Sequence, residues 1–234
     1  MYNKNIHANW KDVNAMTPCA FCPRMNPVTR IARILIALLW LMSLACDGAA
    51  ATTQSILVFG DSLSAPYGIP EKRAWVSLLA ERLKKERLDY KVVNASISGE
   101  TTSGGRGRLA KVLVEHKPAV VILELGGNDG LRGLSVAEMK KNLGAMIEQS
   151  RKAGARVLLV GTRMPPNYGP EYTQAYEAVF ADLAQSHKIA LAPDLTAGIG
   201  DRLELFLPDR VHPNESAQPA LLENVWNALR PLLK

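Results

Sequence analysis

The sequence predicts an α/β fold, a three-layer α/β/α sandwich with a five-stranded parallel sheet. From Ser55 onward, short apolar runs rich in β-branched residues alternate with longer stretches whose apolar residues recur at helical spacing. Two of the short runs contain almost only valine, isoleucine and leucine, which is typical of strands covered on both faces. Strands that alternate with helices are joined by right-handed crossovers, so helices are expected on both faces of one sheet.

The predicted elements follow from these two patterns. The third and fourth strands are the nearly continuous Val/Ile/Leu runs, and the others are shorter apolar runs. In chain order the strands are Ser55–Phe59, Lys91–Asn94, Ala119–Leu125, Arg156–Val160 and Ile189–Ala192. The amphipathic stretches between and after them predict helices at Ala74–Glu86, Gly107–His116, Val136–Ala153, Tyr172–His187 and about Ser216–Leu233. No internal repeat or linker in this part of the sequence indicates a second domain.

Residues 1–51 are interpreted as a leader that contains a signal peptide. Ile34–Ala45 is an uncharged apolar run that follows two arginines and precedes the small residues Gly48–Ala51. A basic segment, twelve apolar residues and an alanine-rich site are typical of a secretory signal peptide, whereas a membrane span needs about 20 residues. We expect cleavage after Ala50 or Ala51, with Met25 as a candidate for the true start. The domain that follows, residues 52–234, is then periplasmic or secreted.

Charge and cysteine content also distinguish the leader from the rest of the chain. The whole chain has a formal net charge of +6, which raises nucleic-acid binding as a candidate. The leader holds five basic and two acidic residues, so residues 52–234 carry only +3. It also holds all three cysteines, and a thiol-free domain suits an oxidising compartment. We therefore expect no nucleic-acid partner; lipidation of Cys46 remains open.

Candidate catalytic residues lie in the loops at the carboxyl edge of the predicted sheet, where ligands of open parallel sheets bind. Ser62 follows the first strand in Gly-Asp-Ser-Leu, as a candidate nucleophile or simply the N-cap of a helical turn. His212 lies three residues after Asp209, before the last helix. At this spacing the carboxylate can reach the Nδ1–H of the imidazole and leave Nε2 to accept a serine proton, although a surface ion pair is the alternative.

Other loop residues are candidates for binding the substrate. Gly99 can bring its backbone N–H close to a ligand, and the Asn128 amide can donate to an oxyanion, although Gly-Gly-Asn-Asp is also a common turn. Pro165 and Tyr168, after the fourth strand, can line an acyl-chain groove or form a structural turn. Glu124 interrupts the apolar third strand, so its carboxyl group must be paired or neutral there.

Together these motifs resemble those of the GDSL, or SGNH, hydrolase family. The chain has Gly-Asp-Ser-Leu, Ser-Gly-Glu-Thr, Gly-Gly-Asn-Asp and Asp-x-x-His in that order, and the resemblance covers residues 54–232. Residues 94–101, 124–133 and 212–214 are similar to the branch with periplasmic acyl-CoA thioesterase, arylesterase and lysophospholipase activity. The resemblance implies a flavodoxin-like fold.

The family resemblance also implies a role for each motif residue. Ser62 would be the nucleophile, His212 the general base and Asp209 its orienting group. The oxyanion hole would consist of the backbone N–H of Ser62, the backbone N–H of Gly99 and the side chain of Asn128.

The implied activity is that of a serine esterase, which cleaves small acyl esters and thioesters through an acyl-enzyme. Such an enzyme requires no metal or cofactor, and we expect a monomer without a stable membrane span. A carbohydrate-ester deacetylase with the same triad is one alternative, and a non-catalytic secreted binding module is the other. The physiological substrate and its acyl-chain length are left open by the sequence.

Overall fold

The computed structural model describes residues 26–28, 32 and 53–233. Contacts between residues divide the chain into two units, Met1–Ala51 and Thr52–Lys234. The apolar run of the predicted signal peptide, its cleavage site and all three cysteines lie outside the described residues. Within the described part, no helix combines the length and apolar content needed to cross a membrane.

The second unit contains the predicted five-stranded sheet, in which every paired strand is parallel. Its strands are β1 (Gln54–Gly60), β2 (Tyr90–Asn94), β3 (Val120–Glu124), β4 (Arg156–Val160) and β5 (Ala190–Ala192). The spatial order is β2-β1-β3-β4-β5, the arrangement of flavodoxin-like folds. The predicted fold class is therefore confirmed.

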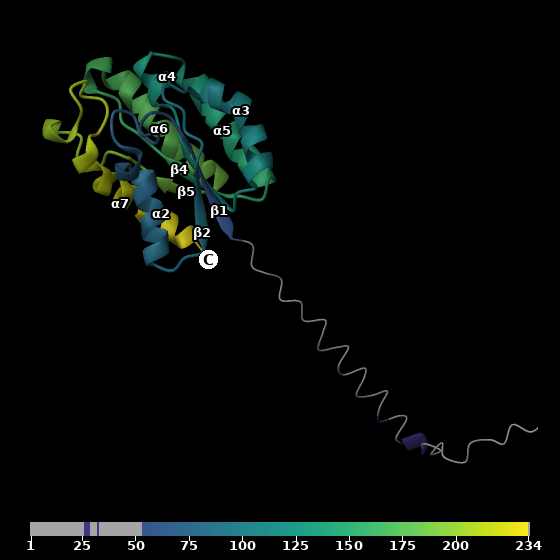
Figure 1. The fold of residues 1–234 in the computed structure, drawn as a ribbon. Helices are drawn as coiled ribbons and strands as arrows, with labels where there is room; N and C mark the ends of the chain where they lie inside the picture. The colour runs from purple at the N-terminus through teal and green to yellow at the C-terminus, as the bar shows by residue number, and fades with distance from the viewer. Residues whose placement is uncertain (1–25, 29–31, 33–52, 234) are drawn as a thin grey trace, which may run out of the picture. The chain divides into compact units, whose positions relative to one another are not determined.

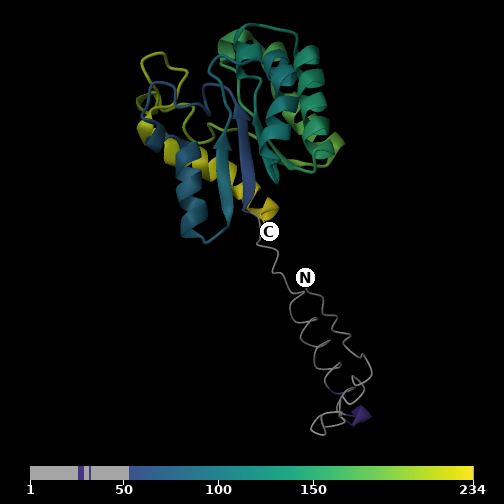
Figure 2. The ribbon, with the colours of Figure 1, turned by 45° about the vertical axis from the view of Figure 1, so that its right-hand side comes forward.

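Helices cover both faces of the sheet (Figure 1). They are α2 (Trp75–Lys85), α3 (Thr102–His116), α5 (Val136–Lys152), α6 (Pro170–His187) and α7 (Gln218–Leu229). Figure 2 shows α2 and α7 on one side of the sheet and the α3 and α5 pair on the other.

Successive strand residues alternate between the two cores that these helices form. In β1, Ile56 and Val58 pack with α2 and α7, whereas Leu57 and Phe59 pack with α3, α5 and α6. All four side chains are fully buried. Because both faces are covered, β3 and β4 are apolar except at Glu124 and Arg156, and each buried apolar side chain contributes about 1.5–3 kcal/mol.

Two helical segments differ from the predictions, and both lie near the site described below. The helix predicted from Gly107 begins at Thr102, with Thr101 as its N-cap. Its first turn contains glycines, which have low helix propensity, but the buried carboxylate of Asp129 accepts hydrogen bonds from the backbone N–H and the hydroxyl of Thr102, at 2.8 and 2.5 Å. Residues Gly127–Leu131 form a short helix, α4, in the segment expected to be the loop after the third strand.

Candidate active site

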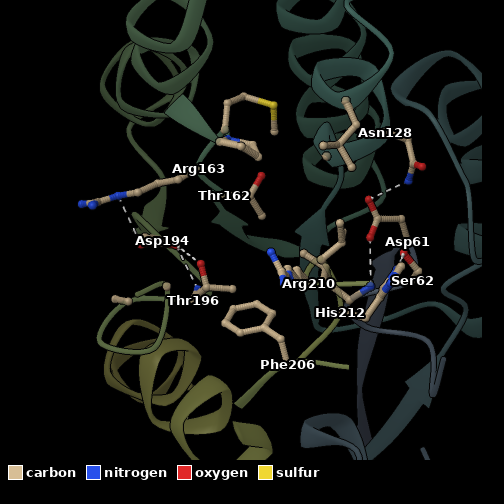
Figure 3. Close-up of a pocket in the computed structure, with 18 of the residues that line it drawn as sticks. Asp61, Ser62, Asn128, Thr162, Arg163, Asp194, Thr196, Phe206, Arg210 and His212 are labelled. Atoms are coloured by element: carbon tan, nitrogen blue, oxygen red, sulfur yellow. Dashed lines mark hydrogen bonds and ion pairs between the residues drawn. The ribbon is translucent and has the colours of Figure 1, made fainter. Parts of the chain in front are cut away.

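A cavity of about 960 Å³ lies at the carboxyl edge of the sheet (Figure 3). The loops after all five strands contribute to it, together with the loop before α7. Five predicted site residues line this cavity: Ser62, Gly99, Asn128, Pro165 and His212. Ser62 and His212, 150 positions apart in the chain, thus meet because parallel strands all end at the same edge.

Ser62 lies at the start of a single helical turn that directly follows β1. The turn is closed by a hydrogen bond of 2.8 Å from the backbone N–H of Ala65 to the carbonyl oxygen of Asp61. Gly60 precedes this turn, and a Cβ there would lie 2.6 Å from Glu124 Oε2 and 2.8 Å from Ser64 Oγ. Only glycine therefore allows the loop that carries Ser62 to pack this closely on β3.

Ser62, His212 and Asp209 are joined by two hydrogen bonds. His212 Nε2 lies 2.8 Å from Ser62 Oγ, and His212 Nδ1 lies 2.8 Å from Asp209 Oδ2. Asp209 Oδ1 accepts the backbone N–H groups of Val211 and His212, at 2.9 and 3.0 Å. Partial burial opposes ionisation of Asp209, but these hydrogen bonds prevail and hold the pKa of its carboxyl group below the usual range. An ionised Asp209 can therefore orient the imidazole.

The His212 ring is held from two further directions. The ring of Tyr67 lies against it with the ring centroids 4.2 Å apart. The His212 carbonyl oxygen accepts the backbone N–H of Leu207 at 2.8 Å, and Phe206 pairs with Pro213 in an antiparallel bridge. Residues 206–213 thus form a closed hairpin that carries both Asp209 and His212.

The three expected oxyanion donors all belong to residues that line the cavity. Within the part of the chain that the structure describes, the backbone N–H groups of Ser62 and Gly99 donate to no protein acceptor. Gly99 has a φ of 80°, and its carbonyl oxygen accepts a hydrogen bond of 3.0 Å from Arg132. Asn128 Nδ2 donates to Asp61 Oδ2 at 3.1 Å, which leaves its second amide hydrogen for a ligand.

Two buried carboxyl groups, those of Asp61 and Glu124, lie close to Ser62. Glu124 is fully buried, and its Oε2 accepts the Ser64 hydroxyl at 2.6 Å and the backbone N–H of Asp61 at 3.4 Å. Burial raises the pKa of Asp61 to about 6, although hydrogen bonds from Leu63 and Asn128 lower it. Burial, and then the negative charge of Asp61, raise the pKa of Glu124 well above its usual range. Glu124, whose partners the sequence did not reveal, is thus protonated when Asp61 is ionised.

The protonated Glu124 makes stability depend on pH. The folded protein keeps this proton above pH 4.5, where the unfolded chain releases it, so the free energy of unfolding falls as pH rises toward the raised pKa. Glu124→Gln has no such proton and keeps an acceptor for Ser64. We expect the variant to gain stability relative to the wild type by up to about 1.4 kcal/mol per pH unit. Urea unfolding of both proteins at about pH 4.5, 6 and 7.5 measures this; a difference independent of pH would show that Glu124 is ionised in the folded protein.

The structure does not bring every predicted residue to the cavity. Pro165 lines it, but Tyr168 is not among the lining residues in the described part of the chain. The Tyr168 hydroxyl instead donates to the Leu131 carbonyl oxygen at 2.8 Å, and its ring stacks on Tyr172 with centroids 6.2 Å apart. Its contacts are those of a structural residue that supports the loop after α4.

Several residues that line the cavity were not predicted as site residues from the sequence, and most of them lie in the loop after β5. Asp194 is largely buried there; it accepts from the backbone N–H and the hydroxyl of Thr196 at 2.9 Å each, and pairs with Arg163 at 3.2 Å. The rule that ligands bind at the carboxyl ends of strands applies to the fifth strand as well and would have indicated this loop. Other lining residues, among them Thr162, Phe206 and Arg210, have no sequence signal of their own.

Comparisons with known proteins agree with this geometry. Residues 58–218 match the model of the GDSL-like Lipase/Acylhydrolase family. The chain is 50% identical over 183 residues to Esterase TesA of Pseudomonas aeruginosa, covering 78% of this chain and 91% of the relative. It is 36% identical over 184 residues to the thioesterase 1/protease 1/lysophospholipase L1 of Escherichia coli, covering 79% and 87%. A crystal structure of TesA superimposes with a TM-score of 0.76 at 50% identity and covers 77% of this chain and all of that chain.

Proposed function

The chain belongs to the GDSL-like lipase/acylhydrolase family, and on that premise we propose that it is an exported serine esterase that cleaves acyl esters and thioesters through an acyl-enzyme. It is a hydrolase that acts on esters, like the relatives named above. The observation that carries the mechanism is the pair of 2.8 Å hydrogen bonds that join Asp209, His212 and Ser62 at the cavity wall. Export is supported by the signal-peptide pattern of residues 34–51.

In the proposed mechanism, Ser62 Oγ attacks the acyl carbonyl carbon while His212 Nε2 takes the hydroxyl proton. Asp209 holds the Nδ1–H tautomer and stabilises the imidazolium that forms. The proton then passes from His212 to the departing alkoxide or thiolate, and the acyl group remains on Ser62. A water molecule, deprotonated by His212, attacks the acyl-enzyme and releases the fatty acid.

The negative charge on the carbonyl oxygen is expected to be stabilised by the backbone N–H groups of Ser62 and Gly99 and by Asn128 Nδ2. These donors need no rearrangement, because the two N–H groups are unpaired in the described structure and Asp61 already holds the Asn128 amide. Leu131, Met164 and Pro165 add apolar surface to the same cavity. We propose that this surface receives medium to long acyl chains, so that aryl esters, acyl-CoA thioesters and lysophospholipids are substrates.

A fluorophosphonate probe and a substrate panel test this function together. Only an activated serine reacts with the probe, so we expect one modified peptide, with the label on Ser62. The panel consists of p-nitrophenyl esters of increasing chain length, an acyl-CoA, a lysophospholipid and acetylated xylan. Labelling with hydrolysis of octanoyl substrates supports the proposal. Labelling with activity on acetylated xylan alone would favour a carbohydrate-ester deacetylase, and no labelling would contradict a serine mechanism.

A further inference from the structure

Arg210 has an unusual backbone conformation inside the hairpin that carries Asp209 and His212. Four described residues other than glycine have positive φ, and three of them, Arg87, Lys117 and Lys188, follow helix C-termini, where the left-handed conformation is common. Arg210, with a φ of 58°, closes the turn that its backbone N–H forms with the Leu207 carbonyl oxygen at 2.9 Å. Glycine is the usual residue at such a hairpin position, and a side chain there is disfavoured. Strained residues of this kind cluster at functional sites.

Among the three arginines of the described cavity lining, only Arg210 has no ion-pair or hydrogen-bond partner for its side chain. Arg163 is paired with Asp194 at 3.2 Å, and Arg202 is paired with Glu204 at 3.0 Å. Arg210 lines the same cavity, and no side-chain hydrogen bond or ion pair involves it in the described part of the chain. Figure 3 shows its side chain directed into the cavity beside His212. Its guanidinium group therefore presents five free donors in a planar fork, which matches a phosphate or carboxylate.

The position of Arg210 indicates which end of a substrate it meets. His212 must pass its proton to the leaving group, so the leaving group lies on the His212 side of the scissile bond. Arg210 is two residues from His212, whereas Asn128 and Gly99, the expected oxyanion donors, belong to other loops. An anion on the leaving group can thus reach Arg210 while the carbonyl oxygen remains at the oxyanion donors.

We propose that Arg210 is a specificity-determining residue that binds a phosphate carried by the leaving group of the substrate. This inference rests on the proposed esterase function and narrows its substrate class. Acyl-CoA thioesters and lysophospholipids share a phosphate on the leaving group, which simple aryl esters lack. Glu177 and Asp201 are acidic residues of the described lining that have no hydrogen bond or ion pair there; they disfavour an anion near them and leave Arg210 as the position for the charge.

The test compares each phosphate-bearing substrate with a neutral analogue, its twin, which has the same acyl group but no phosphate. The first pair is octanoyl-CoA and octanoyl-N-acetylcysteamine, and the second is 1-octanoylglycerol 3-phosphate and 1-octanoylglycerol. For each protein, the measured quantity is the ratio of kcat/KM for the phosphate substrate to that for its twin. Arg210→Gln is expected to lower this ratio by about tenfold or more in at least one pair, mainly through KM, and Arg210→Lys is expected to lose less. The affected pair identifies whether the phosphate belongs to a thioester carrier or to a lipid headgroup.

Two further variants distinguish phosphate binding by Arg210 from a general effect of losing one positive charge and from an effect on folding. Arg87→Gln removes an exposed arginine that also has a positive φ, has no side-chain partner among the described residues and does not line the cavity. Its ratio should stay within about twofold of the wild-type value. Arg210→Gly should lower the ratio as Arg210→Gln does, with a Tm no lower than that of the wild type, because glycine adopts this φ without strain.

The outcomes distinguish failure of the inference from failure of the proposed function. A ratio that Arg210→Gln leaves unchanged in both pairs, or that Arg87→Gln lowers equally, overturns the role of Arg210 and leaves the esterase proposal standing. A wild-type protein that cleaves neither the neutral nor the phosphate substrates overturns both.

Discussion

Replacement of Ser62 by alanine is expected to lower kcat for p-nitrophenyl octanoate by about 10⁴- to 10⁶-fold. Without Oγ no acyl-enzyme can form, and the oxyanion donors alone retain only a small residual acceleration. The fold should be unaffected, because Ser62 is half-buried and its side chain bonds only His212 in the described structure. Initial rates with purified wild-type and variant protein, with Tm as a check of folding, measure the effect.

A double variant makes the test of Ser62 sharper. If Ser62 and His212 act as one unit, Ser62→Ala combined with His212→Ala should be no slower than Ser62→Ala alone, within a few-fold. Independent contributions would instead multiply. A Ser62→Ala protein that keeps more than about one tenth of the wild-type kcat would exclude Ser62 as the nucleophile, whatever the double variant does.

Asp209→Asn is expected to lower kcat at neutral pH by about 10⁴-fold while the hairpin keeps its shape. In the wild-type protein, Asp209 Oδ1 accepts the backbone N–H groups of Val211 and His212 at 2.9 and 3.0 Å, and the asparagine Oδ1 can accept the same two groups. Its Nδ2 would face His212 Nδ1 and donate to it, so the ring proton would move to Nε2. The imidazole could then no longer accept the proton of Ser62.

Asp201→Asn is the matched control for this variant. It removes one carboxylate from the same described cavity lining, and Asp201 has no hydrogen bond to His212. Its kcat should remain within about tenfold of the wild-type value, since a nearby charge alone has a modest effect. Equal losses in the two variants would mean that Asp209 acts through charge and not through the tautomer of His212.

Prediction from the sequence was most successful where the signal was local. The strands were recognisable because a doubly covered strand needs apolar side chains at successive positions, as at residues 120–123 and 157–160. The pairing of Asp209 with His212 could be predicted because His212 follows Asp209 by three positions, which places both on one turn. Where the determining contacts are distant in sequence, prediction was incomplete. The first turn of α3 depends on Asp129, 27 residues away, and the state of Glu124 depends on Ser64 and Asp61, about 60 residues away.

The sequence by itself therefore determined the order of strands and helices, the α/β class and the residues able to form an esterase site. Those properties follow from periodicity and residue type, which are local. Only the tertiary structure decided that Ser62 Oγ and His212 Nε2, 150 residues apart, lie 2.8 Å from each other and that Glu124 is fully buried. It also decided that Arg210 lines the cavity without a side-chain partner among the described residues. The distance between Ser62 and His212, the burial of Glu124 and the pairing of Arg210 all depend on how the loops pack at the common edge of the sheet. They are properties of the folded chain as a whole.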